Sequence, residues 1–174
     1  VFSQRHDHWN PQVEKRFLDQ VRREGHRALL AFCSPIAPRN DEALAASAAS
    51  GVRVIHIDHY REQLPDQEYL LPDYRKAGHM AAVELMLAGC EQIVSVGLAT
   101  AAPYGLLHQR GVADALTEHG LGFDLARNRF VIPPAFFEHP ESVAALVATA
   151  TGAGAVGFAC ESTGLASSVT RVLR

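Results

Sequence analysis

The chain has 174 residues, of which 48% are hydrophobic and 20% are charged, and its formal net charge at pH 7 is −3. This composition is typical of a globular protein with a sizeable apolar core and excludes a disordered or fibrous chain. The slightly acidic balance lacks the concentrated positive charge needed to bind a phosphate backbone, so we do not expect these residues to bind nucleic acid.

Short apolar runs alternate with amphipathic or alanine-rich segments along the chain. The runs predicted as strands are residues 1–4, 27–33, 52–58, 68–71, 92–97, 129–132 and 155–160. The segments predicted as helices are residues 10–26, 38–51, 74–89, 108–121, 141–151 and 163–174. In the first helix Asn10 is the predicted N-cap, Pro11 the first helical residue and Gly25 the stop. Apolar strands separated by helices predict an α/β fold with doubly wound parallel sheets.

Parallel α/β sheets bind their ligands beyond the carboxyl ends of the strands. The residues that follow the predicted strands are therefore the candidates for a binding site. In chain order they include Ser34, Asp58 and Tyr60, then the segments 98–105 and 160–163.

Two local patterns suggest a cofactor or metal, but both fail on context. The segment "GAGAVG" (152–157) matches G-x-G-x-x-G, but a dinucleotide-binding turn must follow a strand and open a helix, whereas here a helix precedes it. The pairs "HDH" (6–8) and "HIDH" (56–59) lack a third convergent ligand at a fixed spacing. We therefore expect no cofactor and no metal.

Catalysis, disulfides and membrane insertion are also not indicated. The chain has no G-x-S-x-G elbow and no marked carboxylate pair, so we do not expect an enzyme. Its three cysteines, at widely spaced positions in or beside apolar runs, suit reduced thiols of a cytoplasmic protein. No apolar run reaches the roughly 18 residues of a membrane span.

Four segments carry motifs in a fixed order. They are "VRVIHIDHY" (52–60), "PDYRKAGHMAAVELMLAGCEQIVSVG" (72–97), "HQRGVADALTEHGL" (108–121) and "AVGFACESTGLASSVTRVL" (155–173). The first resembles V-x-V-x-x-I-D-R, the third R-x-x-G-[FYW]-x-x-A-L-x-x-x-G-[IL] and the fourth A-[IV]-x-x-x-N-D-x-x-A-x-G. Together they resemble the effector-binding domain of the LacI/GalR family of bacterial transcription regulators.

The resemblance implies a periplasmic-binding-protein-like fold, with two doubly wound parallel-sheet lobes and a ligand cleft between them. It assigns residues 1–71 to an N-terminal lobe whose first strand-helix unit is missing, and residues 72–174 to an incomplete C-terminal lobe. A small polar effector, a sugar or sugar-like molecule, would bind in the cleft and change DNA affinity through lobe closure. DNA would be bound by a helix-turn-helix outside these residues, in a homodimer. The alternative is a periplasmic sugar-binding protein of a transport system.

The resemblance also points to individual binding residues. Asp58 matches the family's Asp at the cleft, where an ionised carboxylate accepts two sugar hydroxyls, although an Asp here can also cap a loop. Tyr60 and Phe137 would stack on a ring, with a surface tyrosine and a core phenylalanine as the alternatives.

Two positions depart from the family pattern. His108 stands three residues before Gly111, where the family has an arginine, and a titratable imidazole there predicts weaker, pH-dependent anchoring. Ser162 and Thr163 are interpreted as replacing the Asn-Asp pair after "AVGFA", which predicts hydroxyl hydrogen bonds to the ligand instead of ion pairs. A common pentose or hexose bound in the usual way is therefore not expected.

Overall fold

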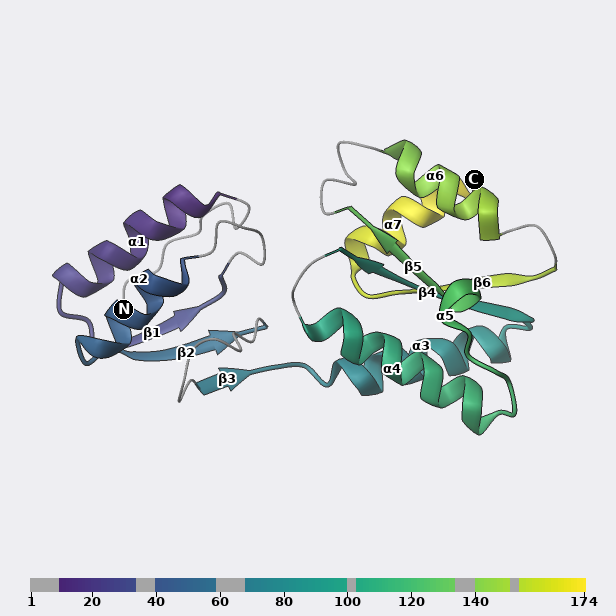
Figure 1. The fold of residues 1–174 in the computed structure, drawn as a ribbon, viewed down its shortest axis with the longest axis horizontal. Coiled ribbons are helices and arrows are strands. Elements are labelled where there is room, and N and C mark those ends of the chain that lie inside the picture. Colours follow the sequence, from purple (N-terminus) through teal and green to yellow (C-terminus); the bar gives the residue numbers. More distant parts are fainter. Residues whose placement is uncertain (1–9, 34–39, 59–67, 100–102, 134–139, 151–153) are drawn as a thin grey trace. The chain divides into compact units, whose positions relative to one another are not determined.

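The computed structural model describes residues 10–33, 40–58, 68–99, 103–133, 140–150 and 154–174 (Figure 1). These residues form two compact units. Unit 1 comprises the described part of Val1–Pro72 together with Pro103, and unit 2 comprises the described parts of Asp73–Thr100 and Tyr104–Arg174.

Unit 1 contains a parallel three-stranded sheet and two helices. Its elements are α1 (Pro11–Arg23), β1 (Ala28–Ala31), α2 (Asp41–Ala49), β2 (Arg53–Ile57) and β3 (Glu68–Leu70), and the strand order is β1-β2-β3. Helix α1 begins as predicted, because the Asn10 side chain accepts hydrogen bonds from the backbone N–H groups of Gln12 and Val13 at 3.2 and 3.3 Å. Gly25 follows the helix with a φ of +66°, a conformation that glycine adopts without strain.

The core of unit 1 lies between the helices and one face of the sheet. Leu18 and Val21 of α1 and Leu44 of α2 pack against Leu29 and Ala31 of β1. A side-chain link joins the two helices, since the Asn40 amide donates to Glu14 Oε2 at 2.9 Å.

The opposite face of this sheet carries apolar side chains. Leu30 on β1 and Leu70 on β3 are each 62% exposed. Within the described residues, both helices of unit 1 pack on the other face, so helices cover this sheet on one side.

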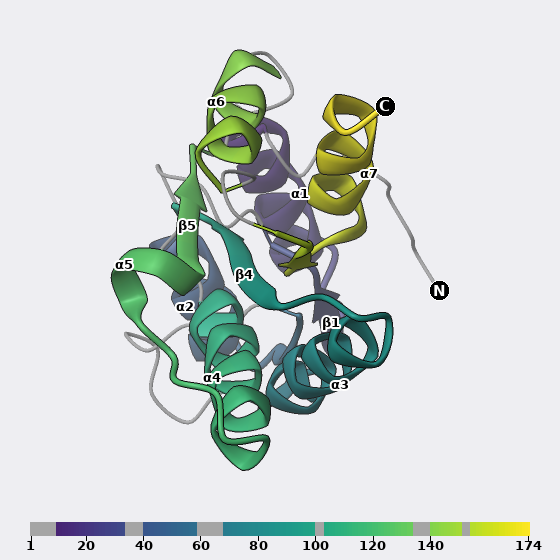
Figure 2. The same cartoon turned by 90° about the vertical axis from the view of Figure 1, so that its right-hand side faces the viewer.

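Unit 2 is a three-layer sandwich around a second parallel sheet. Its elements are α3 (Tyr74–Leu87), β4 (Gln92–Leu98), α4 (Pro103–Glu118), α5 (Leu125–Asn128), β5 (Arg129–Ile132), α6 (Pro140–Ala150), β6 (Val156–Cys160) and α7 (Thr163–Val172). The strand order is β5-β4-β6. Helices α6 and α7 cover one face and α3 and α4 the other, as Figures 1 and 2 show. The prediction of a doubly wound parallel sheet is thus confirmed in this unit.

Unit 2 has a hydrophobic core on each face of its sheet, and the central strand β4 contributes side chains to both. Val94 and Val96 face α6 and α7 and are fully buried. Ile93 faces the opposite side, where it packs with Ala82 of α3 and Val112 of α4. No helix among the described residues is both long and apolar enough to span a bilayer.

Helix α4 begins earlier than the sequence pattern predicts. It starts at Pro103, whereas the predicted start is His108. The segment 103–107 has no apolar-polar contrast strong enough to mark a helix start, and Gly105 lowers its helix propensity. His108 therefore lies in the second turn of the helix and not at its entry.

Helices α3 and α4 approach one another closely through two glycines. A methyl group added at Gly111 would overlap the carbonyl oxygen of Arg75, and one added at Gly78 would overlap the carbonyl oxygen of His108. Two side-chain contacts flank this approach, an ion pair from Arg75 to Asp114 at 2.6 Å and a hydrogen bond between His79 Nε2 and the Glu118 carboxylate at 2.7 Å. The glycine inside the "HQRGVADALTEHGL" segment is thus required by helix packing.

Candidate functional site

Each unit presents polar residues at the carboxyl ends of its parallel strands, where ligands bind in α/β sheets. In unit 1 the described residue at this edge is Asp58, which follows β2 directly. In unit 2 the corresponding residues are Glu161, Ser162 and Thr163, which follow β6. The predicted site residues Ser34, Tyr60 and Phe137 lie outside the described residues.

Asp58 combines partial burial with an unusual backbone conformation. Its φ is +69°, which among the described non-glycine residues is unique. Its backbone N–H donates to the Leu70 carbonyl at 3.0 Å, so the conformation is fixed by pairing with the end of β3. Burial raises the pKa of its carboxyl group. Asp58 is thus a half-buried acid at the end of β2 whose backbone is held in the left-handed region.

Ser162 and Thr163 begin helix α7. Ser162 is the N-cap, and its hydroxyl oxygen accepts from the Leu165 backbone N–H at 3.3 Å. Thr163 is the first helical residue and is exposed. The Ser162 hydroxyl therefore has a structural role, while its own proton stays available to a ligand acceptor.

Glu161 is the half-buried acid of unit 2. Its Oε1 accepts from the Leu98 backbone N–H at 2.7 Å, which links the ends of β6 and β4. Its Oε2 is buried without a hydrogen-bond partner. Burial raises the pKa of this carboxyl to about 7, with the Leu98 hydrogen bond opposing the rise.

His108 is buried on the neighbouring helix. Its side chain is enclosed, with the residue only 4% exposed, and its Nδ1 has no hydrogen-bond partner. Burial lowers the pKa of the imidazole, so the neutral form is favoured. His108 follows Gly105 by three residues, so it lies one turn further along the same face of α4 as the glycine that borders Glu161.

The prediction that Ser162 and Thr163 occupy the Asn-Asp positions of the fourth motif is wrong by two residues. Counted from Ala155, the pattern A-[IV]-x-x-x-N-D puts these positions on Cys160 and Glu161, and not on Ser162 and Thr163. The acidic group of the motif is therefore present as a glutamate. This glutamate can be predicted from the sequence when the motif is aligned from Ala155.

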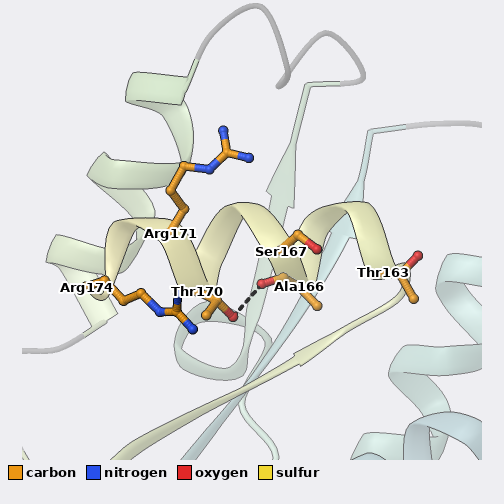
Figure 3. A pocket seen from close by; sticks show the side chains of 6 residues that line it. All are labelled: Thr163, Ala166, Ser167, Thr170, Arg171 and Arg174. Carbon is orange, nitrogen blue, oxygen red and sulfur yellow. Dashed lines mark hydrogen bonds between the residues drawn. The ribbon is translucent and has the colours of Figure 1, made fainter.

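One surface pocket occurs away from these strand ends. It has a volume of about 470 Å³ and is lined by residues of a single helix and its C-terminal end: Thr163, Ala166, Ser167, Thr170, Arg171 and Arg174 (Figure 3). The Thr170 hydroxyl is already engaged, since it donates to the Ala166 carbonyl at 2.8 Å. The pocket is the outer face of α7, and only Thr163 belongs to the predicted site.

The structure agrees with the rejection of the dinucleotide motif. Helix α6 ends at Ala150, and Val156 and Gly157 of the motif lie in β6, so no helix begins there. His56 of the "HIDH" pair is buried in β2, while His6, His8 and His59 lie outside the described residues. In the part of the chain that the structure describes, no three histidine, cysteine or acidic side chains converge as metal ligands would.

Comparisons with known proteins bear on the fold. No family model matches the chain, and no curated protein matches it in sequence. The Cra transcriptional dual regulator from Pseudomonas putida, solved with fructose 1-phosphate, is similar with a TM-score of 0.71 and 18% identity, over 94% of this chain and 58% of its own. GanP, a glucose-galactose binding protein from Geobacillus stearothermophilus, has a TM-score of 0.66 and 16% identity, over 94% of this chain and 57% of its own. The fold is periplasmic-binding-protein-like.

This fold is shared by regulators and transport proteins. A sugar-binding transcriptional regulator of the LacI family from Escherichia coli, complexed with phosphate, is 17% identical with a TM-score of 0.63, over 94% of this chain and 56% of its own. The chain thus spans between half and two thirds of the length of each of these solved proteins. The likeness to LacI-family regulators first found in the motifs extends to the periplasmic-binding-protein-like fold.

Proposed function

We propose that this chain is the ligand-sensing core of a LacI-type transcription regulator and that it binds a small polar effector, a sugar or sugar-like molecule. The observation that carries this proposal is Asp58, a half-buried acid held at the carboxyl end of β2 with a φ of +69°. A carboxylate there can accept two ligand hydroxyls. The LacI-like order of the four motifs, together with the periplasmic-binding-protein-like fold, supports the regulator assignment.

In this proposal the effector is held by strand-end residues of both units. It stabilises the closed arrangement of the two lobes in proportion to its difference in affinity for the closed and open states. Closure then changes the DNA affinity of a helix-turn-helix outside this chain, in a cytoplasmic homodimer. The domain itself catalyses no reaction.

Isothermal titration calorimetry against sugars, sugar phosphates, sugar acids and nucleobases tests the sensing role. A hydrogen bond to a charged group contributes about 1.5–3 kcal/mol, so Asp58→Asn should weaken binding by about tenfold or more. Asp19→Asn is the matched control, because Asp19 is a surface acid on α1 of the same unit. Absence of binding across the panel would contradict the sensing role. Equal affinity of the wild type and Asp58→Asn would contradict the role of Asp58.

A sugar-binding protein of a transport system is the second candidate, and the similarity to GanP favours it. The two candidates differ outside this chain. A helix-turn-helix encoded upstream of Val1, with operator binding by the full-length protein, is expected for a regulator. A signal peptide encoded there would support transport.

A further inference from the structure

The Glu161 carboxyl occupies a niche formed by two glycines from different elements. A methyl group at Gly97, near the end of β4, would lie 2.6 Å from Glu161 Oε2. A methyl group at Gly105, in the first turn of α4, would overlap the same oxygen. The carboxyl therefore fills space that a side chain at either glycine would take. It connects three elements at one edge of unit 2, namely β4, β6 and α4.

No described cation compensates this carboxyl. On β4 the adjoining residues are Gly97 and Leu98, which carry no titratable side chain. On α4 the titratable side chains within three residues of Gly105 are the Tyr104 phenol and the His108 imidazole, the latter kept neutral by burial. On β6 burial and the nearby Glu161 raise the pKa of the Cys160 thiol to about 12. At the start of α7, Ser162 and Thr163 are uncharged.

We propose that Glu161 is a protonation switch for this edge of unit 2, closed when its carboxyl is neutral and opened when the carboxyl is ionised. A neutral carboxyl fits the niche, because it keeps the Leu98 hydrogen bond at 2.7 Å and leaves no buried charge. An ionised carboxyl leaves Oε2 as a buried negative charge without a partner, and the side chain can relieve this only by leaving the niche. When the Glu161 side chain leaves the niche, its hydrogen bond from Leu98 breaks and its carboxyl no longer packs against the first turn of α4.

The direction of the pH effect follows from proton linkage. The pKa of Glu161 rises from an ordinary 4.5 to about 7 in the folded unit, so the folded unit retains a proton that the opened unit releases. Opening is least favourable below pH 4.5 and becomes more favourable as pH rises towards about 7. A single linked proton changes the opening equilibrium by up to about tenfold per pH unit within that window.

Carbon-detected NMR of the full chain, labelled with ¹³C in the glutamate side chains, measures the switch directly. The resonance that disappears in Glu161→Gln identifies the residue. We expect it to titrate with a midpoint near 7, the pKa that burial produces. A midpoint near the ordinary 4.5 would overturn the proposal.

Hydrogen exchange by mass spectrometry, corrected for the intrinsic pH dependence of exchange, tests the structural consequence. Protection of the Leu98 amide, which donates to Glu161, and of residues 107–108 should fall by about tenfold or more between pH 5.5 and pH 7.5 in the wild type and stay constant in Glu161→Gln. Glu84→Gln, which neutralises an exposed acid on α3, should behave as the wild type. An equal loss of protection in wild type and Glu161→Gln would contradict the switch.

The Gly105→Ala variant tests whether the two-glycine niche causes the raised pKa of Glu161. The added methyl group displaces the carboxyl into solvent while favouring the helix. The Glu161 midpoint should then fall towards 4.5. A midpoint that stays near 7 would show that the two-glycine niche is not the cause of the proton affinity.

Discussion

Substitution of Gly111 by alanine tests whether the contact between α3 and α4 is a backbone-to-backbone contact. The added methyl group would overlap the Arg75 carbonyl oxygen and lie 2.7 Å from the His79 backbone nitrogen. Backbone atoms within a helix cannot rotate away, so the two helices must separate. Overpacking of this kind costs about 1–3 kcal/mol, and we expect the upper end because both neighbours belong to the backbone.

Two smaller effects change the expected free-energy cost of Gly111→Ala. Alanine favours the helix by about 1 kcal/mol over glycine, which offsets part of the cost. Separation also weakens the Arg75–Asp114 ion pair, but a surface pair contributes about 0–1 kcal/mol. The expected net loss is about 2 kcal/mol, which corresponds to a fall in Tm of about 4–8 °C for a chain of this length.

The assay is thermal unfolding followed by circular dichroism, with hydrogen exchange of the α3 and α4 peptides to locate the effect. Gly122→Ala is the matched control, because no atom lies within 4 Å of the position its added methyl group would take, and it should change stability by less than about 0.5 kcal/mol. Gly78→Ala should destabilise similarly, and the double substitution should cost less than the sum, since the first already separates the helices. Unchanged stability of Gly111→Ala would refute the close approach.

Three further predictions concern the strand-end residues. Asp58→Gly should be more stable than Asp58→Ala by about 1 kcal/mol in urea unfolding, because both lack the carboxylate and only alanine is strained at a φ of +69°; equal stability would argue against the left-handed conformation. Ser162→Ala should cost about 1 kcal/mol in the same assay and Ser162→Asn much less, because asparagine also caps a helix; equal losses would argue against the cap. Cys160 should be alkylated at pH 8 at least about a hundredfold more slowly than glutathione, because burial raises its pKa to about 12; rapid labelling, measured by mass spectrometry, would contradict the raised pKa.

The sequence predicts the elements well wherever local signals and periodicity agree. Asn10 and Pro11 mark the start of α1, and Asp73 marks that of α3, where its side chain accepts from the Lys76 backbone N–H at 2.9 Å. The apolar run of β4 is buried on both faces, as a central parallel strand requires. The start of α4 is predicted five residues too late because Gly105 interrupts its helical pattern, and that glycine borders the acid that follows β6.

The site is harder to predict than the fold, because its properties depend on contacts between distant segments. Nothing around Glu161 in the sequence indicates that Gly97 and Gly105 enclose its carboxyl, more than fifty positions away. The interpretation of His108 as a titratable anchor rests on its residue type alone, whereas burial in unit 2 keeps the imidazole neutral. Asp58 could be placed at a strand end from its motif, but its backbone strain depends on pairing with Leu70.

Two glycines and two polar residues of unit 2 differ in what the packing of the unit explains about them. Gly78 and Gly111 are fixed by the packing of α3 on α4, so they report the scaffold and say nothing about the ligand. His108 and Glu161 also pack against glycines, but each retains a buried side-chain atom without a hydrogen-bond partner. Close packing therefore explains the glycines but leaves these two polar atoms unexplained. For this chain, the motifs support a comparison of fold with LacI-family regulators, whereas the proposed ligand has to be tested at Asp58 and at the acid and imidazole of unit 2.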